Sequence, residues 1–180
     1  MLRHGRRTSK ATGLALSLLV GVLTTACGPV LPEHPGDESL VLGFRVTDQA
    51  IEVKVPVCAG EKLSRVEVWD PGDETKKERL LWWAEGPQDR SADHGLLRLW
   101  SPDDYRKAST AGKPSPPPPR VDVSVTYAGQ DDSVGDLVDL GEAAKHQPAN
   151  EFWTIKGHPM TAEEIDGQLS CPAERAGLRR

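Results

Sequence analysis

Apolar and polar residues alternate with a period of two in several short segments beyond residue 38. The clearest segments are 40–46, 51–57 and 121–127, in which an apolar residue stands at every second position. Successive side chains of a β-strand point to opposite faces of the sheet, so this pattern predicts strands with one buried face. Weaker versions of the pattern predict further strands at 63–69, 80–84, 95–100, 133–140 and 152–156.

Turn-forming residues separate these segments. Residues 70–73 read Asp-Pro-Gly-Asp, a strong turn signal, and residues 39–57 are predicted to form a hairpin. We therefore expect a mainly β fold, a single antiparallel β-sandwich or barrel-like domain of about seven or eight strands over residues 39–180. One short helix is expected near the end, because Thr161 and Glu164 fit a capping box and Gly167 would end the helix.

The first 26 residues differ in character from the rest of the chain. They contain four basic residues and no acidic one, and residues 11–26 form an uncharged run rich in leucine, valine and alanine. As a helix this run would be roughly 24 Å long, shorter than the ~30 Å hydrocarbon core of a bilayer. A basic start, a short apolar stretch and small residues at its end are typical of a cleaved export signal.

The end of this run carries the most specific motif of the chain. Residues 23–28 read Leu-Thr-Thr-Ala-Cys-Gly, which resembles the lipobox of bacterial lipoproteins; the chain is also similar in style to small β-rich lipoproteins of actinobacterial type. The resemblance implies that Cys27 is diacylglyceryl-modified and that the signal peptide, residues 1–26, is removed just before it. The family usually has leucine where this chain has Thr24. The alternative is an ordinary export signal that leaves Cys27 as a plain thiol.

The resemblance also implies a location. Lipid attached to Cys27 would anchor the protein to membrane lipid at the extracytoplasmic face of the cell membrane, and residues 27–38, which contain three prolines, would serve as a tether. The two remaining cysteines, Cys58 and Cys171, would then lie in an oxidising compartment. We expect them to form a disulfide that pins the C-terminal segment to the end of the second strand. The alternative is a pair of free or metal-binding thiols.

Charge restricts the classes of partner. The whole chain has a formal net charge of -5, and removal of residues 1–26 leaves 18 Lys and Arg against 27 Asp and Glu, a charge of -9. This acidity argues against nucleic-acid binding. The charge also favours a domain that faces solvent or a basic partner. The partner that we predict is an unidentified envelope protein or a glycan. Trp82 and Trp83 are candidate contact residues, because adjacent residues of a strand point to opposite faces and at least one indole should lie away from the core. The alternative is that one of them packs inside and the other is half covered by the loop of residues 101–120.

No catalytic motif stands out, and no cofactor or metal site is predicted. The histidines of the exported part form no HxH or HxxxH pair, and the acidic residues between 131 and 142 do not match a calcium loop, so a solvated acidic loop is the simpler interpretation. We therefore predict a binding or protein-interaction module at the cell surface. The alternative is a hydrolase-like enzyme of the cell envelope whose site the sequence does not reveal.

Overall fold

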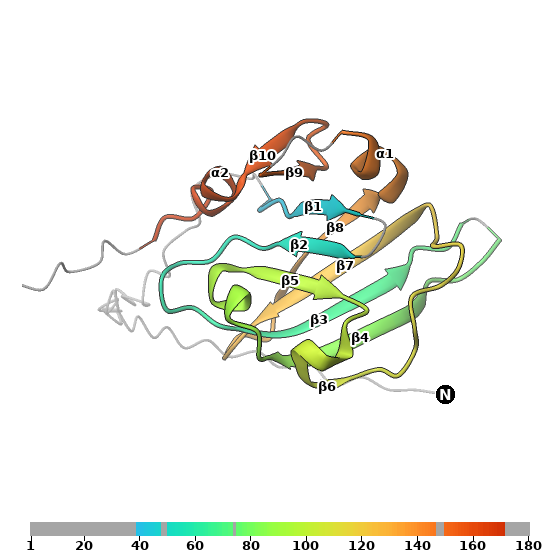
Figure 1. Cartoon of the computed structure of the whole chain (residues 1–180), viewed down its shortest axis with the longest axis horizontal. Coiled ribbons are helices and arrows are strands. Elements are labelled where there is room, and N and C mark those ends of the chain that lie inside the picture. Colours follow the sequence, from blue (N-terminus) through green and yellow to red (C-terminus); the bar gives the residue numbers. More distant parts are fainter. Residues whose placement is uncertain (1–38, 48–49, 74, 147–149, 172–180) are drawn as a thin grey trace, which may run out of the picture. The chain divides into compact units, whose positions relative to one another are not determined.

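In the part of the chain that the structure describes, ten strands form two antiparallel five-stranded sheets that pack as a β-sandwich (Figure 1). This is a computed structural model, and it describes residues 39–47, 50–73, 75–146 and 150–171. The mainly β prediction is confirmed. The first sheet has the order β10-β9-β1-β2-β5, and the second has the order β6-β4-β3-β7-β8. Among the described residues, no helix has the length and apolar character needed to cross a membrane.

The strongest sequence patterns all give strands, but two of these are shorter than predicted, because residues 40–42 and 55–57 lie outside them. The first sheet consists of β1 (Gly43–Val46), β2 (Ile51–Lys54), β5 (Leu96–Leu99), β9 (Glu151–Thr154) and β10 (Pro159–Thr161). The second consists of β3 (Leu63–Asp70), β4 (Arg79–Pro87), β6 (Tyr105–Ala108), β7 (Arg120–Tyr127) and β8 (Ser133–Asp139). The predicted hairpin is confirmed, since β1 and β2 pair antiparallel with Phe44 opposite Val53.

The core lies between the two sheets. Phe44 and Val53 of the first sheet, and Val68 and Val123 of the second, have no exposed surface. Full burial of such an apolar side chain contributes about 1.5–3 kcal/mol relative to exposure, so the alternating residues supply the main force that holds the sheets together. The period of two in the sequence thus marks the inward face of each strand.

Two strands and one helix were not predicted. Strand β6 has Arg106 and Lys107 exposed at its centre, and β10 is only three residues long and starts with a proline, so neither shows an apolar alternation. Helix α1 (Leu140–Lys145) begins where the sequence predicts the end of a strand. It is a short turn of helix with two buried residues, too short to show a helical period. Helix α1 is therefore additional to the one short C-terminal helix that the sequence predicts.

Helix α2 (Ala162–Asp166) confirms the predicted capping box. The Thr161 side chain accepts a hydrogen bond from the Glu164 amide, and the Glu164 carboxylate accepts one from the Thr161 amide. Gly43 lets α2 approach β1 closely, because a Cβ on Gly43 would lie 2.6 Å from the Cβ of Phe152 and would also collide with Ile165. Phe152 and Ile165 are both buried and form a small apolar cluster under α2. Two short 3-10 turns, η1 (Arg90–His94) and η2 (Pro102–Asp104), complete the described elements.

Candidate functional site

Trp82 and Trp83 lie on opposite faces of β4, as the sequence predicts. Trp82 is fully buried, with its ring centre 5.5 Å from that of Tyr105 and 6.3 Å from that of Trp100. Its role is therefore in the core, which corrects its assignment as a possible contact residue. Trp83 is half-buried on the outward face of the second sheet. Only the second of the two tryptophans can meet a partner without rearrangement of the core.

Trp83 belongs to a group of side chains on the outer side of β3 and β4. We call this group the tryptophan face, and it consists of Arg65, Glu67, Trp69, Trp83 and Glu85. In the antiparallel register Trp83 stands opposite Glu67, and Arg65 stands opposite Glu85. Cross-strand partners point to the same side of a sheet, and all five side chains are half-buried, so they reach solvent together.

Trp69 was not predicted as a contact residue, although a signal for it exists in the sequence. Val66 and Val68 occupy the inward positions of β3 and are buried. Position 69 must then point outward, on the same side as Glu67. A bulge between Val68 and Trp69 shifts the register locally, and Trp69 stands opposite Leu80. Leu80 is itself partly exposed, at 36%.

Ion pairs hold the tryptophan face in one arrangement. The Arg65 guanidinium contacts the carboxylates of both Glu67 and Glu85, and its Nε donates to Glu67 Oε1 over 2.7 Å. Trp69 Nε1 donates to the other oxygen of Glu67 over 3.2 Å. The Arg65 Cζ atom lies 5.2 Å from the centre of the Trp83 ring, within the range of a cation–π contact. One guanidinium thus links both carboxylates and an indole.

The neighbouring strands extend this surface with polar residues. On β7, Asp122 stands opposite Trp69, Ser124 opposite Glu67 and Thr126 opposite Arg65. On the other side, Lys107 of β6 stands opposite Glu85. Ser124 and Thr126 add hydroxyl groups, and the charged residues of the widened surface number two cations against three carboxylates. The surface is therefore close to charge balance.

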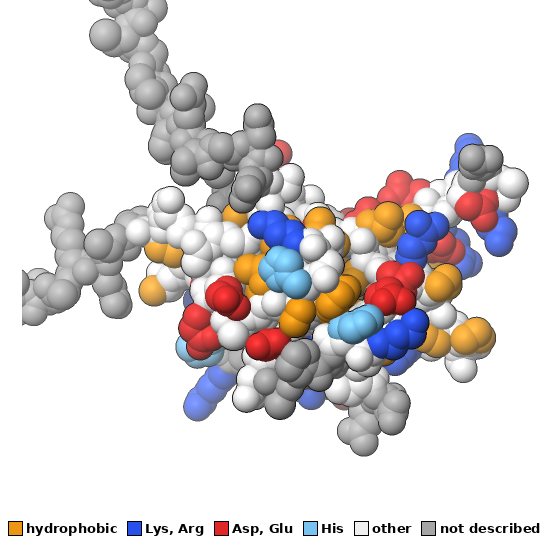
Figure 2. Space-filling model, turned by 90° about the horizontal axis from the view of Figure 1, so that it is seen from above, with side chains coloured by type: hydrophobic (Ala, Val, Ile, Leu, Met, Phe, Trp, Pro, Cys, Tyr) orange, Lys and Arg blue, Asp and Glu red, His pale blue; other side chains and the backbone are white. Residues whose placement is uncertain are grey.

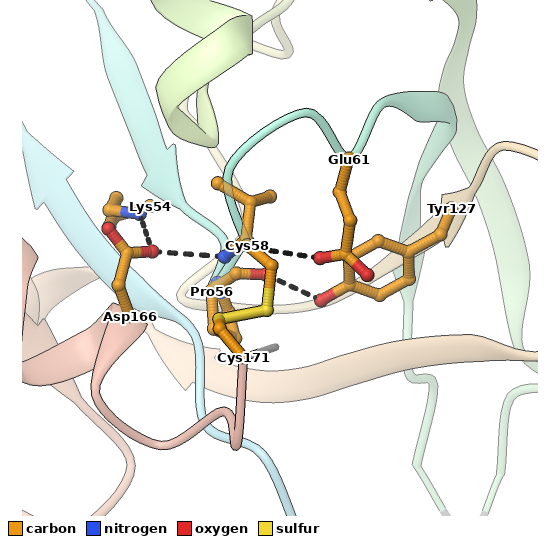
Figure 3. The surroundings of a disulfide bond; sticks show 8 residues. Lys54, Pro56, Cys58, Glu61, Tyr127, Asp166 and Cys171 are labelled. Atoms are coloured by element: carbon orange, nitrogen blue, oxygen red, sulfur yellow. Dashed lines mark hydrogen bonds and ion pairs between the residues drawn. A yellow bond between two sulfur atoms is a disulfide. The ribbon is translucent and has the colours of Figure 1, made fainter. Parts of the chain in front are cut away.

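The predicted disulfide is confirmed. Cys58 and Cys171 are bonded, and their Cα atoms lie 5.4 Å apart (Figure 3). Next to them, Asp166 of α2 accepts hydrogen bonds from the buried Lys54 ammonium and from the Val57 amide. These contacts fix the C-terminal segment to the end of β2. We refer to Lys54, Cys58, Asp166 and Cys171 as the C-terminal clamp.

Two further contacts border the C-terminal clamp. The Tyr127 hydroxyl donates to the Pro56 carbonyl over 2.7 Å, and burial, with smaller contributions from Glu61 and Asp166, raises the pKa of Tyr127 to about 12. The Glu61 carboxylate accepts a hydrogen bond from the Cys58 amide over 2.7 Å (Figure 3). The groups around the disulfide therefore satisfy one another, which is the chemistry of a structural staple.

The acidic stretch between residues 131 and 142 differs from its predicted form. Much of it is strand β8, and Asp136 points inward and is only 6% exposed. Its Oδ2 accepts a hydrogen bond from the Leu42 amide over 2.6 Å. Burial raises the pKa of Asp136 to about 6, and the nearby Asp122 also raises it, while the hydrogen bond and Lys156 act in the opposite direction. The expectation of a solvated loop fails at this residue, because it follows the inward positions of a strand.

A shallow pocket lies beside β5 and η2. It is lined in part by Asp89, Arg98, Asp104 and Tyr105. Arg98 already pairs with Asp104 over 2.7 Å, and the Tyr105 hydroxyl donates to the Arg98 carbonyl. Within the described residues, no group of three or more His, Cys, Asp or Glu is placed to hold a metal ion.

A second surface carries apolar side chains. Figure 2 views the molecule of Figure 1 from above, and on this side the apolar side chains lie next to histidine, acidic and basic side chains. The elements on this side include β9 and α1, where the half-buried Trp153 stacks on His146 with 4.9 Å between ring centres. Ile155, just after β9, is 49% exposed. The Trp153 ring therefore has a partner within the protein.

Comparisons with known proteins identify no relative of this chain. The chain matches no protein-family model, no curated protein and no solved structure. The predicted signal peptide, the lipidated Cys27 and the tether of residues 27–38 all lie outside the described residues.

Proposed function

We propose that the protein is a membrane-anchored extracytoplasmic lipoprotein whose β-sandwich acts as a binding or interaction module at the cell surface. The observation that carries the binding role is the tryptophan face, which presents Trp69 and Trp83 on the outer surface of the second sheet. Half-exposed indoles combine a large apolar contact area with a polar edge, which makes tryptophan frequent at binding sites.

The sequence of residues 1–28 supports the anchored location, with Cys27 as the lipid attachment site. The Cys58–Cys171 disulfide is consistent with export, because disulfides persist in oxidising compartments and are rare in the cytosol. A hydrolase-like enzyme is less favoured, because the Arg98 guanidinium and the Tyr105 hydroxyl beside the shallow pocket already have partners within the protein. The proposed partner is an envelope protein or a glycan, and no cofactor is invoked.

Replacement of the lipid attachment site tests the location. Cys27→Ala should abolish incorporation of labelled palmitate, and the protein should appear in the medium or as the unprocessed precursor instead of in the lipid-anchored membrane fraction. The double variant Cys58→Ser and Cys171→Ser is the matched control, because it removes two thiols and leaves residues 23–28 intact; it should keep the label. If Cys27→Ala is still labelled and remains in the membrane fraction, the anchoring proposal is wrong.

A further inference from the structure

We propose that the tryptophan face binds a neutral glycan chain built of hexoses or N-acetylhexosamines. This inference rests on the proposed binding function and names its ligand class. Sugar rings are amphipathic: their C–H faces stack on aromatic rings, and their hydroxyl groups form hydrogen bonds at the ring edge. A surface for such a ligand needs aromatic rings and polar groups side by side on a flat support.

The aromatic requirement is met by two indoles on neighbouring strands. Trp83 of β4 and Trp69 of β3 lie on the same outer face, both next to Glu67: Trp83 stands opposite it, and Trp69 follows it by two positions on β3. At about 3.3 Å per residue, Glu67 and Trp69 lie about 6–7 Å apart along the strand, so one extended ligand can reach both indoles. The exposed Leu80 stands opposite Trp69 and lengthens the apolar part of this surface.

The polar requirement is met by the groups between and beside the indoles. Side-chain exposure is 36% for Arg65, 25% for Glu67 and 32% for Glu85, so each keeps polar atoms within reach of solvent. A carboxylate accepts hydrogen bonds at several lone pairs, and a guanidinium has five N–H donors, so the pairs described above leave capacity for sugar hydroxyls. Ser124 and Thr126 add groups that can both donate and accept.

Charge favours a neutral ligand over a charged one. The part of the chain beyond residue 26 has a formal charge of -9, whereas the tryptophan face with its neighbours Lys107 and Asp122 carries two cations and three carboxylates. An anionic polymer would be repelled by the domain as a whole. A strongly cationic peptide would find Glu67 and Glu85 of this surface already paired with Arg65. A neutral glycan meets neither obstacle.

The ion pairs also favour binding by fixing the surface in advance. Trp69 is held through its Nε1–H by Glu67, and the Arg65 guanidinium lies over the Trp83 ring. Side chains that are already ordered lose less conformational entropy when a ligand binds. The tryptophan face is therefore preorganised along the two strands that carry its aromatic rings.

The test uses the full-length protein, purified from membranes in detergent, and three soluble probes: chitotetraose, cellotetraose and mannotetraose. Binding is measured by calorimetry and by the change in tryptophan fluorescence. We expect at least one probe to bind, and Trp83→Ala and Trp69→Ala each to weaken that binding roughly tenfold or more, as the loss of an aromatic anchor does. Trp83→Phe should retain part of the affinity, because it keeps an aromatic ring.

Trp153→Ala is the matched control, since it removes a half-buried indole that is not part of the tryptophan face. It should bind the probe as the unmodified protein does, and circular dichroism should show the same fold for every variant. The glycan proposal is overturned if none of the three probes binds, or if Trp83→Ala and Trp69→Ala bind as tightly as the unmodified protein. Capture of a protein partner that depends on Trp83, without glycan binding, would reject the glycan and retain the binding module.

Discussion

Asp136 offers a sharp test of the sandwich, because it places a carboxylate between the two sheets. Its side chain belongs to β8 of the second sheet, and it accepts a hydrogen bond from Leu42, the residue just before β1 of the first sheet. Burial raises the pKa of Asp136 from 3.8 to about 6. One pKa unit corresponds to about 1.4 kcal/mol, so a shift of this size corresponds to roughly 2–3 kcal/mol.

The sign follows from the direction of the shift. The folded pKa lies above the unfolded one, so the folded protein binds the proton more tightly. The ionised carboxylate therefore destabilises the fold above pH 6, and this penalty disappears as the pH falls from about 6 to about 4. Asp136→Asn keeps an oxygen acceptor for Leu42 and removes the charge. At pH 7.5 we expect this variant to be more stable than the unmodified protein by about 2 kcal/mol.

The measurement is urea unfolding followed by tryptophan fluorescence at pH 7.5 and pH 4.5. The advantage of Asp136→Asn should be largely lost at pH 4.5, where the unmodified carboxyl is protonated in the folded state. Asp136→Ala is the control: it leaves the Leu42 amide without its acceptor and should be less stable than Asp136→Asn at both pH values. The reasoning is refuted if Asp136→Asn is less stable than the unmodified protein at pH 7.5, or if its advantage does not depend on pH.

Two further predictions concern the C-terminal clamp. Asp166→Ala leaves the Lys54 ammonium buried without its carboxylate, and we expect it to lower the free energy of unfolding, measured in urea, by about 3 kcal/mol. Lys54→Met removes the buried charge itself and should lower the free energy of unfolding by less. An equal or larger loss for Lys54→Met would contradict the argument. The double replacement of Cys58 and Cys171 by serine opens a 113-residue loop, and it should lower the free energy of unfolding by about 2–4 kcal/mol. Mass spectrometry without reductant should find both thiols oxidised in the exported protein, and free thiols at both positions would contradict the disulfide.

The sequence predicts those strands whose own alternation of apolar and polar residues shows which side chains are buried. In β7 every second residue is apolar and buried, so the strand and its inward face follow from the pattern alone. Strand β6 lies at the edge of a sheet, and its central residues Arg106 and Lys107 are exposed, so its sequence has no apolar alternation. Helix α1 has only two buried residues, Leu140 and Ala143, which is too few to establish a period. Edge strands and single helical turns are thus the elements that periodicity misses.

The candidate site was predictable to the same limited degree. Alternation establishes that Trp82 and Trp83 point to opposite sides, but only the packing of the two sheets decides which of them is inside. Glu67 and Trp83 become neighbours through the register of β3 and β4, which is set by the bulge and by the turn between these strands. The sequence of either strand alone does not determine this register. The pairing of Arg65 with Glu85 could therefore not be predicted from the sequence.

The two ends of the described domain are joined by contacts that no local pattern reveals. The Val41 amide donates to Gln168 Oε1 over 2.9 Å, and Gln168 Nε2 donates back to the Val41 carbonyl over 3.0 Å. One side chain near the C-terminus thus satisfies both backbone groups of a residue just before β1, as a neighbouring strand would. The disulfide lies three residues beyond Gln168 and fixes the same segment to Cys58. The segment after α2 is therefore held at two places, to Val41 by hydrogen bonds and to Cys58 by the disulfide.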